Sequence, residues 1–110
     1  MASKTTDHYT YRITWSEEDQ QYVGLCSEFP SLSWLETSPE NALLGIRKVV
    51  DKCLKDMKRN GETPPSPFSH RQYSGKLIIR IPPEVHRSLS IQAADHGISL
   101  NRLIASKLQT

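Results

Sequence analysis

The charged residues that could carry chemistry are divided unevenly along the chain of 110 residues. Residues 1–60 hold eight Lys and Arg against nine Asp and Glu, whereas residues 61–110 hold six against three, a net charge of +3. A local excess of cations is typical of a surface that binds a polyanion such as nucleic acid. The C-terminal cations are Arg71, Lys76, Arg80, Arg87, Arg102 and Lys107.

No arrangement of residues typical of catalysis or metal binding is found. The sequence has no Ser/His/Asp order, no glycine-rich phosphate loop and no Cys-x-x-Cys pair, and its four histidines are scattered. The expected buried faces of the first strands carry no spaced carboxylates of the kind that a metal-dependent nuclease needs. We therefore expect no enzyme activity, no metal and no cofactor, and we expect Cys26 and Cys53 to be buried thiols.

Composition favours a protein of the reducing cytoplasm. The longest apolar runs have two to three residues, far short of the roughly 20 that a membrane-spanning helix needs. The first residues are polar and lack the apolar stretch of a secretory signal. Two cysteines are too few for a disulfide scaffold.

The first third of the chain predicts an antiparallel sheet. Tyr9, Tyr11, Ile13 and Trp15 alternate with polar residues, which indicates a strand with one buried face. A polar turn and a second run ending at Cys26 make residues 9–26 a hairpin. Residues 28–35 form a third, shorter extended piece, and a further short strand near Phe68 is left open.

A long helix is predicted after this meander. Ser38 is a suitable N-cap, Pro39 fits the first helical position, and Gly61 is a suitable stop. One apolar stripe follows the helical period, and we expect it to cover the meander and complete a two-layer α+β domain. The stripe consists of Leu43, Ile46, Val50, Cys53, Leu54 and Met57.

The remaining residues predict a strand followed by two helices. Residues 75–81 alternate and end at Pro82-Pro83, a first helix runs from Pro83 or Glu84 to Gly97, and Ser99 is the N-cap of a second. A unit below ~40 residues buries too little surface to be stable alone. We therefore expect this unit to dimerise. The buried stripe expected on its second helix is Leu100, Leu103, Ile104 and Leu108.

Both halves resemble one family. The run SGKLIIRIPPEVHRSLSIQAADHGISLNRLIASKL is similar to the C-terminal ribbon-helix-helix domain of HicB-family antitoxins, and YTYRITWSEEDQQYVGLCSEFPSLSWLETSPENAL resembles their N-terminal domain, a partial ribonuclease-H-like fold. The helix entry departs slightly from the family's usual T-P-E-E-A, because Asn41 replaces the second Glu. The resemblance implies a toxin-binding domain at 1–68, a linker at 69–74 and a DNA-binding domain at 75–110.

This resemblance implies a role in a type II toxin–antitoxin system. The N-terminal domain would cover a small mRNA-cleaving HicA-like toxin, and the C-terminal homodimer would repress the operon by binding operator DNA. In a ribbon-helix-helix dimer, two paired strands enter the major groove. Alternation then turns Leu77, Ile79 and Ile81 into the dimer core. The residues expected to contact DNA are Lys76, Ile78 and Arg80 on the bases, and Ser99, Leu100 and Asn101 on a phosphate.

The acidic turn of the first hairpin is the candidate contact for a basic toxin. It offers Glu17, Glu18 and Asp19, with Glu28 and Phe29 nearby in the sequence. The competing interpretation is that a charged hairpin turn serves solubility, and that Phe29 packs in the core.

Two other functions stay open at this level. The chain could be a ribbon-helix-helix regulator without a toxin, whose N-terminal domain senses a ligand or oligomerises. It could also be an oligomerisation module whose basic tail binds nucleic acid without sequence preference. The sequence does not give the operator, the toxin's identity or the assembly size beyond a dimer.

Overall fold

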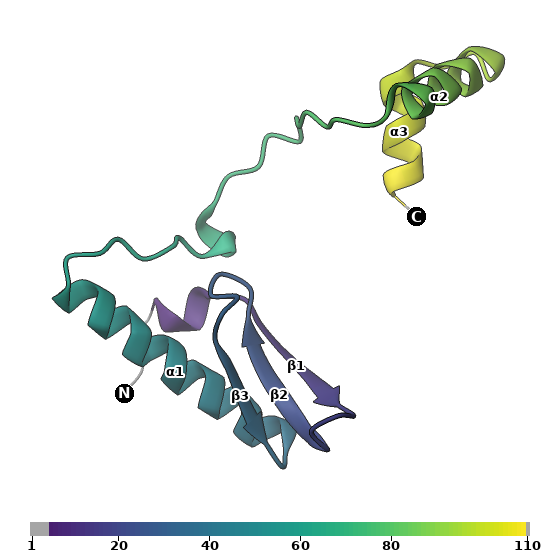
Figure 1. Ribbon diagram of the computed structural model, residues 1–110. Coiled ribbons are helices and arrows are strands. Elements are labelled where there is room, and N and C mark those ends of the chain that lie inside the picture. The colour runs from purple at the N-terminus through teal and green to yellow at the C-terminus, as the bar shows by residue number, and fades with distance from the viewer. Residues whose placement is uncertain (1–4, 110) are drawn as a thin grey trace. The chain divides into compact units, whose positions relative to one another are not determined.

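The computed structural model describes residues 5–109 and divides the chain into two compact units. The N-terminal unit is Met1–Tyr73 and the C-terminal unit is Ser74–Thr110. The N-terminal unit carries a sheet and a long helix, and the C-terminal unit carries two shorter helices (Figure 1). The protein is therefore α+β, as the sequence predicts.

The sheet is the predicted three-stranded antiparallel meander. Its strands are β1 (Tyr11–Ser16), β2 (Gln21–Cys26) and β3 (Ser33–Glu36), with β2 in the centre. The register pairs Tyr11 with Cys26 and Gly24 with Trp34. The third strand is shorter than expected, because residues 27–32 turn through hydrogen bonds from Phe29 N–H to the Cys26 carbonyl and from Leu32 N–H to the Phe29 carbonyl.

Helix α1 (Pro39–Arg59) covers one face of the sheet, as predicted (Figure 1). The Ser38 hydroxyl accepts a hydrogen bond from Asn41 N–H at 3.2 Å, which satisfies one free amide of the first turn. Past the last turn, Gly61 takes a positive φ of 73°. Ile46 and Val50 are fully buried, while Leu43, expected in the same stripe, stays exposed.

The core lies between α1 and the sheet. Its buried residues come from α1, from β2 and from the segments just before β1 and just after β2. Ile46 and Val50 pack with Tyr9, Cys26 and Phe29. Trp15, expected on the buried face, is 45% exposed, because it lies near the end of β1, where its ring packs edge to face against Tyr22. The alternation therefore holds for the first part of the strand and fails at its end.

Two glycines let α1 lie close to the sheet. A Cβ built on Gly24 in the central strand would lie 2.6 Å from the Ala42 carbonyl oxygen, and one on Gly45 of α1 would lie 2.0 Å from the Trp34 ring. Neither contact is possible with a larger side chain unless the neighbour moves. Close approach of the helix to β2 and β3 therefore requires glycine at both positions.

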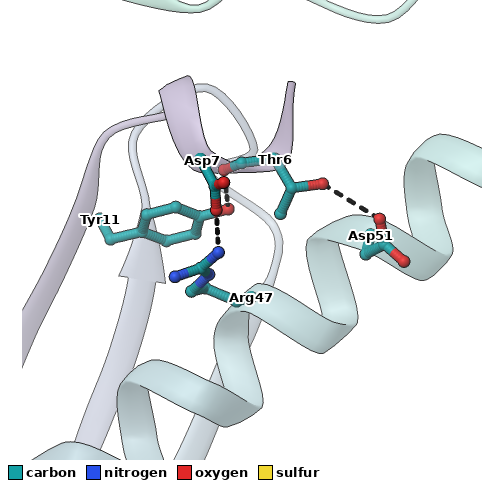
Figure 2. A network of polar contacts seen from close by, with 5 residues as sticks. All are labelled: Thr6, Asp7, Tyr11, Arg47 and Asp51. Atoms are coloured by element: carbon teal, nitrogen blue, oxygen red, sulfur yellow. Dashed lines mark hydrogen bonds and ion pairs between the residues drawn. The ribbon is translucent and has the colours of Figure 1, made fainter. Parts of the chain in front are cut away.

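A short 3-10 turn, η1 (Thr6–His8), precedes the sheet and is absent from the sequence-based prediction. Figure 2 shows how it is tied to the rest of the unit. The Thr6 hydroxyl donates to Asp51 at 3.1 Å, the Tyr11 hydroxyl donates to the Thr6 carbonyl at 2.8 Å, and Asp7 forms an ion pair with Arg47. These contacts join η1 to α1 and β1.

No fourth strand forms in the described part of the chain. Phe68, where the sequence left a strand open, begins a second 3-10 turn, η2 (Phe68–His70). Residues 65–71 contact the N-terminal unit through side chains rather than through a backbone ladder. Residues 69–71, in the segment predicted as a linker, belong to the N-terminal unit, and the Ser69 hydroxyl donates to the His8 carbonyl.

The C-terminal unit contains α2 (Pro83–Asp95) and α3 (Leu100–Leu108), close to the predicted bounds. Gly97 turns the chain between them with a φ of 67°. The strand predicted for residues 75–81 is not formed in the single chain, which has neither helix nor strand there. The physical reason is that a strand needs a partner for its ladder, and no described segment of the chain pairs with these residues.

Candidate functional site

Residues 76–80 present two different sides in the C-terminal unit. Leu77 and Ile79 line a hollow that also involves Asn101, Ile104 and Leu108. Ile78, between them, is 96% exposed. Leu77 and Ile79 thus share a side from which Ile78 is absent, as alternation along an extended segment requires. Lys76 also lines the hollow, and Leu77 and Ile79 remain 70% and 53% exposed.

The two cations expected to contact bases lie in the same segment. Lys76 and Arg80 are exposed, and neither forms an ion pair with any other described residue. Both side chains are therefore available to an anionic partner. Arg80 offers the planar guanidinium that suits guanine O6 and N7, while Lys76 offers a mobile point charge.

The N-terminus of α3 is capped by Ser99. The Ser99 hydroxyl accepts a hydrogen bond from Arg102 N–H at 3.0 Å, and the Ser99 carbonyl accepts one from Leu103 N–H at 3.0 Å. The N–H groups of Leu100 and Asn101 then have no acceptor within the helix. They lie at the positive end of the helix dipole.

The acidic turn between β1 and β2 is exposed at all three of its carboxylates. Two of them also hold the turn together. Glu17 accepts a hydrogen bond from the Trp15 indole at 2.7 Å, and Asp19 accepts one from the Ser16 hydroxyl at 2.8 Å. The turn therefore presents fixed negative charge beside a half-exposed indole ring.

Glu28 is not part of this exposed surface. It is 8% exposed, and its carboxylate accepts hydrogen bonds from Thr10 N–H and the Thr10 hydroxyl, both at 3.0 Å, and from Phe68 N–H at 2.9 Å. The Cys26 thiol lies 3.5 Å away. A carboxylate with these partners ties together the start of β1, the end of β2 and η2, and has little surface left for a toxin.

Phe29 is also a structural residue. It is 8% exposed and packs edge to face against Tyr9, with the ring centroids 5.3 Å apart. This burial leaves Phe29, like Glu28, little exposed surface for the toxin contact that the sequence predicts. Phe29 packs in the core, which is the competing interpretation of this residue. Both residues are close to the acidic turn in the sequence but not in the fold. Strand β2 carries the chain from the turn to the opposite end of the hairpin, where Cys26 pairs with Tyr11.

Sequence reasoning missed the docking of residues 65–71. The Tyr9 hydroxyl donates to the Pro65 carbonyl at 2.6 Å, the Ser69 hydroxyl donates to the His8 carbonyl at 2.8 Å, and the rings of His8 and His70 meet with their nitrogens 2.7 Å apart. These partners are far apart in the sequence and follow no period. One local feature of the sequence points to this docking: the carboxylate of Glu28 directly precedes the aromatic core residue Phe29.

The described residues contain no group of three or more His, Cys, Asp or Glu side chains that could hold a metal ion. None of the helices in residues 5–109 is long and apolar enough to cross a membrane. Cys26 is buried, and this burial raises the pKa of its thiol to about 11, so little thiolate is present at neutral pH. Cys53 is partly buried on α1.

We predict that Glu28→Gln destabilises the N-terminal unit by ~1–3 kcal/mol, because the amide disrupts a buried set of charge-assisted hydrogen bonds. Burial alone raises the pKa of Glu28, but the N–H groups of Phe68 and Thr10 favour the ionised form and lower it overall from 4.5. The wild-type stabilisation is therefore complete above pH 4.5 and is lost as the pH falls through the lowered value.

Urea unfolding followed by tryptophan fluorescence measures this effect, since both tryptophans lie in the N-terminal unit. The matched control is Glu18→Gln at the exposed turn, which should keep the wild-type stability and its loss in acid. Equal unfolding midpoints for Glu28→Gln and the wild type would show that the hydrogen bonds of Glu28 contribute nothing.

The comparison with known families concerns the C-terminal part of the chain. Residues 59–108 match the model of the HicB family. The match begins at the end of α1 and includes η2, α2 and α3, while the sheet lies outside it. No curated protein and no solved structure matches the chain. The match covers 50 of the 110 residues and supports HicB-type membership for this part of the chain.

Proposed function

We propose that this chain is an antitoxin that neutralises a small HicA-like toxin and represses its own operon as a dimer. The proposal rests above all on the side-chain pattern of residues 76–80. Leu77 and Ile79 line the hollow beside α3 together with Lys76, while Ile78 and Arg80 lie outside its lining and are exposed. This is the pattern that a strand needs in order to bury one side in a dimer and present the other to DNA.

The C-terminal unit lacks a core of its own, which supports dimerisation. Within residues 74–109, Ala93 is the one buried residue, at 3% exposed. Large apolar side chains remain exposed to solvent in the same unit, and a unit of this size needs a partner to cover them. A second copy would pair the two extended segments antiparallel and provide the missing ladder. The exposed apolar residues of this unit include Leu77, Ile79, Val85, Ile91 and Leu108.

A paired ribbon would carry two copies of Lys76, Ile78 and Arg80 on one face. The major groove is wide enough for a two-stranded ribbon, and each Arg–guanine contact discriminates between bases by ~1–3 kcal/mol. Ile78 has no donor and would pack on a thymine methyl group. The free amides of Leu100 and Asn101, behind the Ser99 cap, would fix the register on a phosphate.

Toxin binding is assigned to the N-terminal unit at the turn formed by Glu17, Glu18 and Asp19. An mRNA-cleaving toxin binds a polyanion and so presents cations, and the carboxylates of the turn complement that charge. The half-exposed Trp15 ring adds apolar contact area beside them. Glu28 and Phe29 lie buried at the other end of the β1–β2 hairpin, beside Thr10 and Tyr9, and are not proposed to contact the toxin.

We predict that Ile79→Asp abolishes dimerisation of the full-length chain, because a charge would enter the interface between the two extended segments. The matched control is Ile78→Asp, which places the same charge on the outward side and should leave the dimer intact. Sedimentation equilibrium gives the mass of each species. A monomeric wild-type chain, or equal dissociation of both variants, would contradict the proposed ribbon.

Operator recognition predicts an unequal effect of Arg80→Ala. We expect this variant to lose about tenfold or more in affinity for a duplex selected from a random pool by the wild-type chain, since one base contact is worth ~1–3 kcal/mol. Binding to an unselected duplex should change only slightly. Arg87→Ala on α2 serves as the control for charge, and fluorescence anisotropy measures both affinities. Equal losses on the two duplexes would leave Arg80 with an electrostatic role only.

The acidic turn predicts a charge-dependent interaction with a basic protein. In Glu17→Gln/Glu18→Gln/Asp19→Asn, the side chains keep oxygens that accept the bonds from Trp15 and Ser16 while the negative charge is lost. We expect this variant, used as tagged bait in the native cells, to recover much less of a small basic partner than the wild type. The control Glu40→Gln/Glu62→Gln/Glu84→Gln removes the same charge elsewhere. Undiminished recovery by the turn variant would refute the assignment.

A further inference from the structure

We propose that the outer face of α1 is a second DNA-binding surface, which contacts the phosphate backbone beside the operator. This proposal rests on the proposed function, because it takes DNA as the ligand of the C-terminal unit. Its basis is a row of four exposed cations, here called the α1 stripe. The stripe consists of Lys48, Lys52, Lys55 and Arg59.

The spacing of the α1 stripe places all four side chains on one side of the helix. Steps of four, three and four residues keep them within about 60° of one another at 3.6 residues per turn. The buried residues Ile46 and Val50 lie about 160° or more from Lys48 on the same wheel. The stripe therefore points away from the core and is open to a large ligand.

The α1 stripe carries one sign of charge. The carboxylates of the helix, Glu40, Asp51 and Asp56, all lie outside its sector. A helix face that is simply solvated usually alternates positive and negative residues. This excess of positive charge is local to the stripe, because the N-terminal unit as a whole has nine Lys and Arg against ten Asp and Glu. The positive charge of this unit is thus collected on α1.

The cations of the α1 stripe are available for new contacts. Lys48 and Lys52 form no ion pair with another described residue. Lys55 pairs with Asp51 at 2.9 Å and Arg59 with Asp56 at 3.8 Å, but both cations remain more than half exposed. The Arg59–Asp56 pair is exposed and contributes little to stability, so a phosphate can replace that carboxylate. Asp51 is buried and also accepts a hydrogen bond from the Thr6 hydroxyl.

The dimensions suit a nucleic-acid backbone. Eleven residues separate Lys48 from Arg59, which is about 16 Å of helix. One strand of B-DNA carries a phosphate every ~3.4 Å along its axis, so the stripe matches several consecutive phosphates. Three of the four cations are lysines, which bind phosphates as mobile point charges and read no sequence. We therefore infer contact with flanking DNA of any sequence.

The short connection between the units would keep the α1 stripe near any DNA that residues 76–80 bind. Only Gln72–Gly75 separate the docked residue Arg71 from Lys76, the first proposed base contact. Four residues span at most ~3.6 Å each. Once residues 76–80 are on the operator, the N-terminal unit is held near the same duplex at a high effective concentration.

The test compares Lys48→Gln/Lys52→Gln with Arg12→Glu in the full-length chain. Both variants lower the net charge by two, but Arg12 lies on the face of the sheet opposite to α1, and none of these residues forms an ion pair with another residue of the described range 5–109. The probes are a duplex selected from a random pool by the wild-type chain, with about two helical turns (~20 base pairs) of arbitrary flank on each side, and the same duplex trimmed to the selected site.

Affinity is measured between about 50 and 200 mM salt. On the flanked duplex we expect Lys48→Gln/Lys52→Gln to reduce the slope of log K against log salt by ~1 for each lysine removed per bound chain. On the trimmed duplex the slope should match that of the wild type. Arg12→Glu should behave as the wild type on both probes.

Each contrary result identifies what has failed. A wild-type chain that selects no DNA sequence overturns the proposed operator binding and this inference with it. Selected binding with an unchanged slope for Lys48→Gln/Lys52→Gln, or an equal change for Arg12→Glu, overturns the inference alone. The affinity for a single-stranded RNA is measured as well. If Lys48→Gln/Lys52→Gln loses this affinity while its binding to flanked DNA is unchanged, the inference is overturned and RNA is the ligand of the α1 stripe.

Discussion

The buried carboxylate of Glu28 is the contact on which the arrangement of the N-terminal unit depends. It accepts hydrogen bonds from Thr10 before β1 and from Phe68 in η2, and the thiol of Cys26 at the end of β2 lies beside it. A buried charge is costly unless donors surround it, so these three segments must meet for the unit to fold without penalty. With Glu28 fixed, Phe29 enters the core against Tyr9, and residues 65–71 lie against the N-terminal unit. The chain therefore leaves this unit from a defined point.

The two units solve the problem of stability in different ways. The N-terminal unit buries a core of its own between α1 and one face of the sheet. The C-terminal unit exposes its apolar side chains and leaves an extended segment without a ladder. Its stability would then depend on a second copy, and dimerisation would create the surface that reads DNA. On this account, an independently stable domain that covers a toxin is coupled to a domain that acquires its function only by pairing.

Local patterns in the sequence predicted the local elements well. The Ser38-Pro39 start and the Gly61 stop gave the bounds of α1, because capping involves residues close together in the chain. Alternation gave the strands of the meander. The failures concern contacts between distant residues. Glu28 meets partners 18 and 40 positions away, so its burial left no periodic signal. The strand at 75–81 is absent from the single chain, since its expected partner belongs to another copy.

Neutralisation of a toxin is the central claim of this account, and a growth assay tests it most directly. The small basic protein that co-purifies with the tagged chain from its native cells would be expressed alone and together with the full-length chain. The account predicts growth arrest with the partner alone, through loss of intact mRNA, and normal growth and intact mRNA when the chain is present. If the chain recovers only itself and DNA, or if no captured protein arrests growth, the antitoxin function is contradicted and a regulator without a toxin becomes the better description.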